Sequence, residues 1–246
     1  MEGNIVATKE VGRTLRVHII PTETGDIFMV ASPSFKDSCD LHAQATVDAI
    51  RQKDFNNVSM LMLGGYFHHS GKYDELVDVL VERLKLVDQG RKPTIVLTAA
   101  CNQIADGHSI KTAITKLKDL ANVVALANAG EFRRLLGKDK DWRPTDRKPT
   151  DEEYQRANER ALNYAHRKLP EVKFVVTNGE KAIHIVCRRG VSNGYEICRP
   201  IGIVDNTVGA GDAFAGGYLL GLQHALSEPQ GGRLGSVAAS KVKSTK

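Results

Sequence analysis

The sequence predicts an α/β protein in which a mostly parallel sheet carries helices on both faces. From residue 36 onward, short apolar runs of strand length alternate with longer segments whose apolar residues recur every three or four positions. Such alternation is typical of parallel sheets, because each parallel connection needs a crossover helix. With 246 residues, of which 41% are hydrophobic, the chain suits one large domain or a domain with a small appendage.

The first part of the chain predicts a β-hairpin and then the first strand and helix of the repeating pattern. Residues 14–20 and 26–32 are expected to be strands joined by the turn PTETG. Residues 58–65 form an apolar run typical of a buried strand. Residues 72–90 are predicted to be a helix that ends at Gly90. One face of that helix carries Tyr73, Leu76, Val77, Leu80, Val81, Leu84 and Val87.

The alternation continues to the end of the chain. A capping-box pattern, Thr150 with Glu153 three residues later, marks the start of a long predicted helix. Residues 138–150 are polar and rich in proline, as in a surface loop. The expected strands are 93–100, 122–128, 172–178 and 182–188, and the expected helices are 109–121, 129–137 and 151–169.

Composition narrows the classes of function. The net charge of +5, from 34 Lys and Arg against 29 Asp and Glu, is mild and scattered, which gives little support for a nucleic-acid-binding module. The four cysteines form no CxxC pair, so free thiols in a reducing compartment are expected. The first residues do not resemble a leader peptide, and no apolar run has membrane-spanning length. These observations predict a cytoplasmic protein.

The glycine-rich stretch NTVGAGDAFAGGYL, residues 206–219, follows an apolar run and opens a helix-like segment. Glycines let the backbone approach a ligand closely, and the first amides of a helix attract anions, so the stretch suits a phosphate with Asp212 as a base. The alternative is that Asp212 caps the helix and the glycines serve packing. Two other nucleotide motifs fail: Phe214 stands where a dinucleotide fingerprint needs glycine, and Tyr66 and Tyr73 break the P-loop pattern.

This stretch resembles the C-terminal signature of the ribokinase-like (PfkB) family of carbohydrate and nucleoside kinases. The resemblance implies a ribokinase-like doubly wound sheet with a small β lid, ATP as phosphate donor and Mg²⁺ as cofactor. It implies that Asp212 is the catalytic base, and that the anion hole and ATP site include Gly209, Ala210, Gly211, Asn206 and Thr207. Asn206 departs from the family pattern, which usually has Asp there.

Three further segments resemble the same family. VVALANAGEF matches its N-x-x-E motif at Asn128 and Glu131, which implies Mg²⁺ binding, often through water; the alternative is a helix N-cap with a capping box. VVTNGEKAIHI matches an ATP-site turn at Thr177 and Gly179, with Ala182 in place of a final glycine, or is an ordinary hairpin.

The segment MLMLGGYFHHSG resembles adenosine kinases, in which Tyr66 or Phe67 would stack on a purine. A core position is the other reading of either aromatic. The run VLTAACNQ stands where adenosine kinases usually carry an Asn-Leu-Ser-Ala-like run, which leaves the choice of nucleoside open.

The resemblance also implies domain bounds. Residues 1–35 are expected to be a remnant of the β lid, and residues 36–246 the nucleotide-binding domain, incomplete at both ends. The family's opening strand, whose Asp binds sugar hydroxyls, and its Gly-Gly-Asn segment have no match before residue 21. We therefore expect a fragment or a misjudged gene start, with weak or absent turnover from this chain alone.

The expected activity is transfer of the γ-phosphoryl group of ATP to a primary hydroxyl of adenosine or a related nucleoside, which would serve purine salvage. One alternative is a non-catalytic nucleotide-binding relative that acts as a regulatory or assembly subunit. A second is a sugar kinase of the ribose or fructose type. The expected partners are ATP and a small-molecule acceptor, without nucleic acid or membrane, and the oligomeric state is not predicted.

Overall fold

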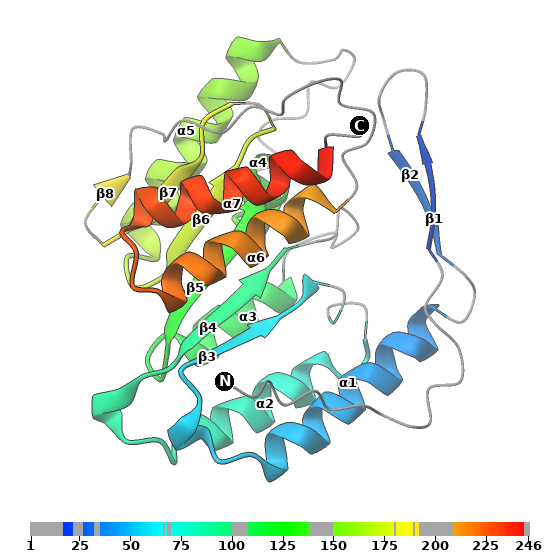
Figure 1. The fold of residues 1–246 in the computed structure, drawn as a ribbon, viewed down its shortest axis with the longest axis vertical. Helices are drawn as coiled ribbons and strands as arrows, with labels where there is room; N and C mark the ends of the chain where they lie inside the picture. The colour runs from blue at the N-terminus through cyan, green and yellow to red at the C-terminus, as the bar shows by residue number, and fades with distance from the viewer. Residues whose placement is uncertain are drawn as a thin grey trace. The chain divides into compact units, whose positions relative to one another are not determined.

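A computed structural model shows the chain as two compact units, the first from residues 1–58 and 66–92 and the second from residues 59–65 and 93–246 (Figure 1). The predicted boundary at residue 35 stays a prediction. No helix in the described part of the chain is both long and apolar enough to cross a membrane. The structure describes residues 17–21, 27–31, 35–65, 67, 70–99, 108–137, 150–179, 181–188, 190–191 and 209–243.

The first unit contains the predicted hairpin and two helices. Strand β1 (Val17–Pro21) pairs antiparallel with β2 (Ile27–Ala31), which confirms the two N-terminal strands. Helix α1 (Phe35–Gln52) packs on α2 (Tyr73–Leu84), and a short 3-10 helix, η1 (Phe55–Asn57), lies between them in the chain. Helix α1 was not predicted. Its buried residues, Cys39, Ala43, Val47 and Ile50, recur every three or four positions but include two small side chains.

Helix α2 buries most of the predicted apolar face, but it ends earlier than predicted. The amides of Lys85, Leu86 and Val87 bond to Val81, Arg83 and Leu84, so the last turn tightens there. The Asp88 side chain then accepts from the Gly90 amide and starts the 3-10 helix η3 (Gln89–Arg91). The prediction that the helix continues to Gly90 was therefore wrong, because an aspartate turn intervenes.

The second unit is built on a six-stranded sheet with the order β3-β4-β5-β6-β7-β8. The first four strands run parallel, and the last two continue antiparallel, as expected of a mostly parallel sheet. The strands are β3 (Met60–Leu63), β4 (Thr94–Thr98), β5 (Asn122–Asn128), β6 (Lys173–Thr177), β7 (His184–Cys187) and β8 (Gly190–Val191).

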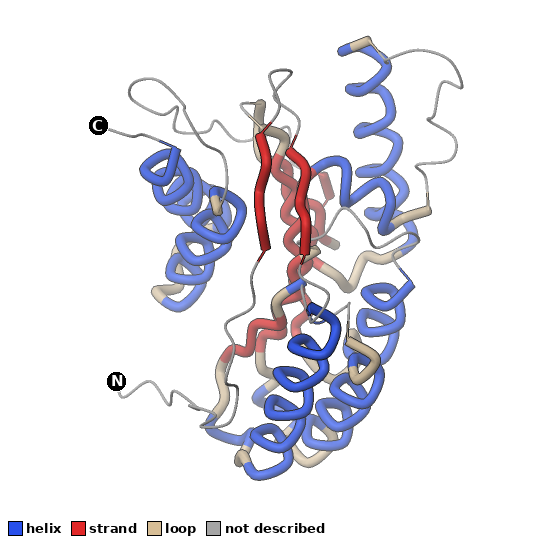
Figure 2. The backbone as a smooth tube through the Cα atoms, turned by 90° about the vertical axis from the view of Figure 1, so that its right-hand side faces the viewer, coloured by secondary structure: helices blue, strands red, loops and turns tan. Residues whose placement is uncertain are grey.

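Helices cover both faces of this sheet, as predicted (Figure 2). Helices α6 (Ala210–Gln223) and α7 (Glu228–Lys243) lie on one face, where Phe214 and Tyr218 pack against a core that includes Val175. Helices α3 (His108–Leu117), α4 (Ala129–Leu135) and α5 (Asp151–Lys168) lie on the other. Helix α5 begins at the predicted capping box.

Glycines bring α6 and α7 into backbone contact. A Cβ at Gly217 would lie 2.7 Å from the Leu234 carbonyl oxygen, and one at Gly221 would lie 2.7 Å from the Cα of Gly231. Side chains at these positions would therefore force the two helices apart. Packing alone explains glycine at both positions.

A buried polar group ties the far end of this helix pair to the sheet. The hydroxyl of Tyr218, which is fully buried, donates to Glu228 Oε2 over 2.6 Å. The other carboxylate oxygen of Glu228 pairs with Lys173 at the start of β6. Helices α6 and α7 are thus fixed to β6 at the end opposite Asp212.

Candidate functional site

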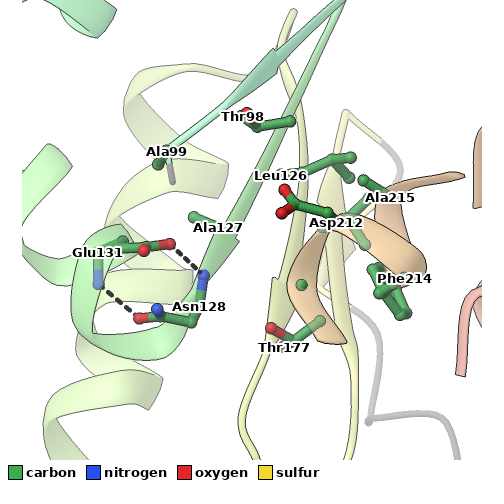
Figure 3. A pocket seen from close by; sticks show the side chains of 12 residues that line it. Thr98, Ala99, Leu126, Ala127, Asn128, Glu131, Thr177, Asp212, Phe214 and Ala215 are labelled. Carbon is green, nitrogen blue, oxygen red and sulfur yellow. Dashed lines mark hydrogen bonds between the residues drawn. The ribbon is translucent and has the colours of Figure 1, made fainter. Parts of the chain in front are cut away.

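A pocket opens where the parallel strands end and α6 begins (Figure 3). The register aligns the ends of β4, β5 and β6, so that their last residues, Thr98, Asn128 and Thr177, lie along one edge of the sheet. Ligands of open α/β sheets bind at this edge. The pocket has a volume of about 110 Å³ and is lined by Thr98, Ala99, Leu126, Ala127, Asn128, Glu131, Val175, Thr177, Gly211, Asp212, Phe214 and Ala215.

The start of α6 forms part of the pocket wall through Gly211 and Asp212, whereas Gly209 is not part of the lining. Gly209 precedes the helix with φ of 77°, a left-handed conformation that glycine adopts without strain. No side chain in the described part of the chain caps the helix, so its first amides have no side-chain partner there. A Cβ at Gly211 would meet no atom of the described residues outside its own helix backbone within 4 Å. Packing against the described residues therefore does not require glycine at 211, and the position suits close approach of a ligand.

Asp212 lies in the first turn of α6 and lines the same pocket, with its side chain exposed. Its carboxylate is close enough to Glu131, on the opposite wall, that its charge helps to raise the pKa of that residue. The pocket thus holds two carboxylates and uncapped helix amides, which is the arrangement expected for a base beside an anion.

Glu131 and Asn128 form a reciprocal capping box at the start of α4. The Asn128 side-chain oxygen accepts a hydrogen bond from the Glu131 amide, and Glu131 Oε2 accepts one from the Asn128 amide, each at a distance of 2.9 Å. Burial, with a smaller contribution from Asp212, raises the pKa of Glu131 to about 7. The helix-cap alternative is therefore what the geometry shows, and it leaves the second carboxylate oxygen of Glu131 available.

The chemistry of these groups fits a hydrated Mg²⁺. Oxygen atoms of Asn128 and Glu131 are hard ligands, and a cation would relieve the repulsion between Glu131 and Asp212. Within the described ranges, no three His, Cys, Asp or Glu side chains are grouped closely enough to bind a metal directly.

Thr177 reaches the pocket, but the glycine after it has a simpler explanation. Strands β6 and β7 form an antiparallel hairpin in which the Lys181 amide donates to the Asn178 carbonyl over 2.9 Å. Gly179 has φ of 57°, which the turn requires. Gly179 and Ala182 do not line the pocket. The ordinary hairpin reading therefore accounts for this segment except for Thr177.

Other predicted site residues are not brought to the pocket in the described part of the chain. Asn206, Thr207 and Tyr66 lie outside the described residues. Ala210 is the half-buried first residue of α6 and is not part of the pocket lining. Phe67 is half-buried and belongs to the first unit.

In the segment around Lys72, which was compared with a P-loop, polar groups bind to a carboxylate of the chain itself. Asp40 on α1 accepts from the Gly71 amide and from the Ser70 hydroxyl, each over 2.7 Å. The Ser70 oxygen in turn accepts from the Lys72 amide over 2.9 Å. These groups at the start of α2 already have an anionic partner, which agrees with the rejection of a P-loop there.

The fold and this glycine-turn site define a ribokinase-like α/β protein. The sequence profile of the pfkB family carbohydrate kinases matches residues 38–246. The chain belongs to the PfkB family. No protein with a curated description matches the sequence.

Solved structures share the fold at low sequence identity. A ribokinase from Cryptococcus neoformans var. grubii, in complex with ADP, has a TM-score of 0.65 and 16% identity over 96% of this chain. A nucleoside kinase from Burkholderia thailandensis, in complex with inosine, has a TM-score of 0.59 and 17% identity over 92%. An adenosine kinase from Sinorhizobium meliloti has a TM-score of 0.57 and 20% identity over 94%. The matched parts span 68%, 60% and 61% of those three chains.

Proposed function

We propose that this chain forms the phosphate-binding and catalytic part of an ATP-dependent kinase. Its acceptor would be a primary hydroxyl of adenosine or a related nucleoside. The observation that carries the proposal is Gly211, which has open space around it at the uncapped start of α6, beside Asp212. Family membership and the kinases of the same fold support ATP as the donor.

In the proposed reaction, Asp212 accepts the proton of the acceptor hydroxyl while the hydroxyl oxygen attacks the γ-phosphorus of ATP. The new oxygen–phosphorus bond forms as the bond to the β-phosphate oxygen breaks, and ADP leaves. The amides at Gly209–Gly211 would stabilise the charge on the transferring group, and Asn206, Thr207 and Thr177 would contribute to the same ATP site. When bound, Mg²⁺ would be held by Asn128 and Glu131 through water and would screen the phosphates.

The second candidate is a nucleotide-binding relative without catalysis, which acts as a regulatory or assembly subunit. This candidate is favoured because the chain spans only part of the matched kinases, 60% of the nucleoside kinase and 61% of the adenosine kinase. A sugar kinase of the ribose or fructose type is the other catalytic candidate, because one matched structure is a ribokinase.

The expected location is a reducing compartment such as the cytoplasm, which the absence of a CxxC pair among the four cysteines of the sequence supports. Tyr66 or Phe67 would stack on the acceptor base if the acceptor is a purine nucleoside.

Thermal-shift titrations with Mg·ATP, adenosine, ribose and fructose test the proposal, followed by transfer of labelled γ-phosphate to each acceptor. A kinase is stabilised by ATP and by one acceptor and transfers label to that acceptor. A non-catalytic relative responds to ATP only. Absence of any response to Mg·ATP, in a folded sample, would contradict both.

A further inference from the structure

Thr98 is a buried hydroxyl in the pocket wall that the proposed reaction does not use. It is the last residue of β4 and is 6% exposed. Its neighbours along the wall include Asn128, Glu131 and Asp212, which the reaction does use. A buried polar side chain in an apolar strand needs a hydrogen-bonding reason to be there.

A hydrogen bond with Gly65 is part of that reason. The Gly65 amide donates to the Thr98 hydroxyl oxygen over 2.8 Å, in a buried bond. Strands β3 and β4 pair in parallel up to Leu63 and Leu97, so Gly65 lies just beyond the ladder. A buried backbone amide without a partner is costly, and the Thr98 side chain supplies the partner that the ladder no longer provides.

In this hydrogen bond the Thr98 hydroxyl oxygen is the acceptor, so the hydroxyl hydrogen takes no part in it. A threonine hydroxyl has one donor and two acceptor sites, so an oxygen that accepts from Gly65 still has a hydrogen to donate. Among the described residues, no acceptor is found for that hydrogen. The bond from Gly65 also limits rotation of the hydroxyl, which makes the remaining donor a preorganised group in the pocket wall.

We propose that Thr98 is a further ligand-binding residue, whose hydroxyl donates to an anionic phosphate-type oxygen bound in this pocket. The inference rests on the proposed function, because it takes the pocket to hold the phosphates of ATP. Among the described side chains that line the pocket, only Thr98 and Thr177 carry hydroxyls, and Glu131 and Asp212 carry carboxylates. An oxyanion placed among these groups needs donors, and Thr98 supplies one from the β4 side.

The test compares Thr98→Val and Thr98→Ser in the full chain, with Thr115→Val as the matched control. Valine keeps the shape of threonine and removes the hydroxyl, and serine keeps the hydroxyl. Thr115 lies on α3, outside the pocket lining, where its hydroxyl donates only to the Lys111 carbonyl of its own helix. Calorimetric titrations use ATP and tripolyphosphate, each with Mg²⁺, and adenosine as the ligand without phosphate.

We expect Thr98→Val to weaken binding of ATP and of tripolyphosphate by about tenfold or more, the effect of losing one hydrogen bond to a charged group. Thr98→Ser and Thr115→Val should bind both within about twofold of wild type, and adenosine binding should not change. A purely structural role for Thr98 would lower the melting temperature of the valine variant but leave its dissociation constants unchanged.

The outcomes separate this inference from the proposed function. Equal affinity of wild type and Thr98→Val for ATP and tripolyphosphate overturns the role of Thr98 and leaves the kinase proposal standing. If wild type binds tripolyphosphate but not ATP, the kinase proposal fails and the valine variant still decides the role of Thr98. If wild type binds neither, both fail.

Discussion

Three glycines of helix α6 separate a ligand-binding role from a packing role. Gly211, Gly216 and Gly217 lie within seven positions of one helix, yet alanine meets different surroundings at each. A Cβ has open space at Gly211 and at Gly216, but at Gly217 it would lie 2.7 Å from the Leu234 carbonyl oxygen and 2.8 Å from the Gly235 Cα. Only Gly211 lines the pocket. We therefore predict three different outcomes for the same substitution.

The magnitudes follow from these surroundings. Gly217→Ala overpacks the contact between α6 and α7, which costs about 1–3 kcal/mol and lowers the melting temperature by roughly 5 °C. Gly216→Ala should stabilise the free protein by up to about 1 kcal/mol, because alanine is the better helix former. Gly211→Ala should leave the stability of the free protein unchanged or slightly higher, since its methyl group meets no protein atom.

Ligand binding should change at one position only. The methyl group of Gly211→Ala occupies the space that a phosphate needs to reach the helix amides, so the dissociation constant for Mg·ATP should rise by about tenfold or more. Gly216→Ala should bind as wild type does. Thermal melts and calorimetric titrations of the three variants provide both readouts. Wild-type ATP affinity in Gly211→Ala, or a stability loss equal to that of Gly217→Ala, would refute the phosphate-site argument.

Three other predictions follow from described contacts. In the full-length protein, Asp212→Asn should lower kcat by at least about 10²-fold while the ATP dissociation constant stays near wild type, because asparagine cannot accept the hydroxyl proton; unchanged turnover would remove Asp212 from the mechanism. Glu131→Gln keeps a capping-box side chain but does not titrate. The pKa of Glu131 rises from 4.5 to about 7 on folding, so between these pH values the folded state holds a proton that the unfolded state releases. The free energy of unfolding of wild type should therefore fall by up to about 3 kcal/mol between pH 4.5 and pH 7, compared with that of the variant. Paired thermal melts across that range check the difference, and parallel curves would contradict it. Tyr218→Phe should cost about 2 kcal/mol in urea unfolding, because the Glu228 carboxylate loses a buried donor, and a wild-type midpoint would show that the bond contributes nothing.

Regular patterns made much of the fold predictable. The strands at 122–128 and 172–178 and the helix from Asp151 carry strong apolar periodicity or a cap, and the structure has elements at those places. Helix α1 was missed because half of its buried face is formed by Cys39 and Ala43, which contribute weakly to a hydrophobic pattern. The end of α2 was misplaced because the Asp88 turn, not a glycine, follows it.

The candidate site was only partly predictable. The glycine turn indicates a close backbone approach, but sequence cannot distinguish Gly211, which faces open space, from Gly217, which faces another helix. The Asn128–Glu131 spacing is the same for a capping box and for a metal site, so both readings fit one pattern. The run VLTAACNQ, which contains Thr98, bears on the choice of nucleoside in the sequence, but the hydrogen bond of Thr98 with the Gly65 amide, 33 positions away in the chain, could not be predicted from it.

Because glycines bring the backbones of α6 and α7 into contact, we expect these two helices to move together as one rigid unit. Because the two backbones are in contact, a side chain at Gly235 on α7, whose Cβ would lie 2.7 Å from the Phe214 carbonyl oxygen, must displace α6. The proposed base, Asp212, lies on the first turn of α6, and Phe214, whose ring would lie 2.9 Å from the new Cβ, lines the pocket, so such a change would disturb the pocket through packing alone. Loss of activity in such a variant of α7 would then result from the displacement of α6, and it would not show that residues of α7 take part in the reaction.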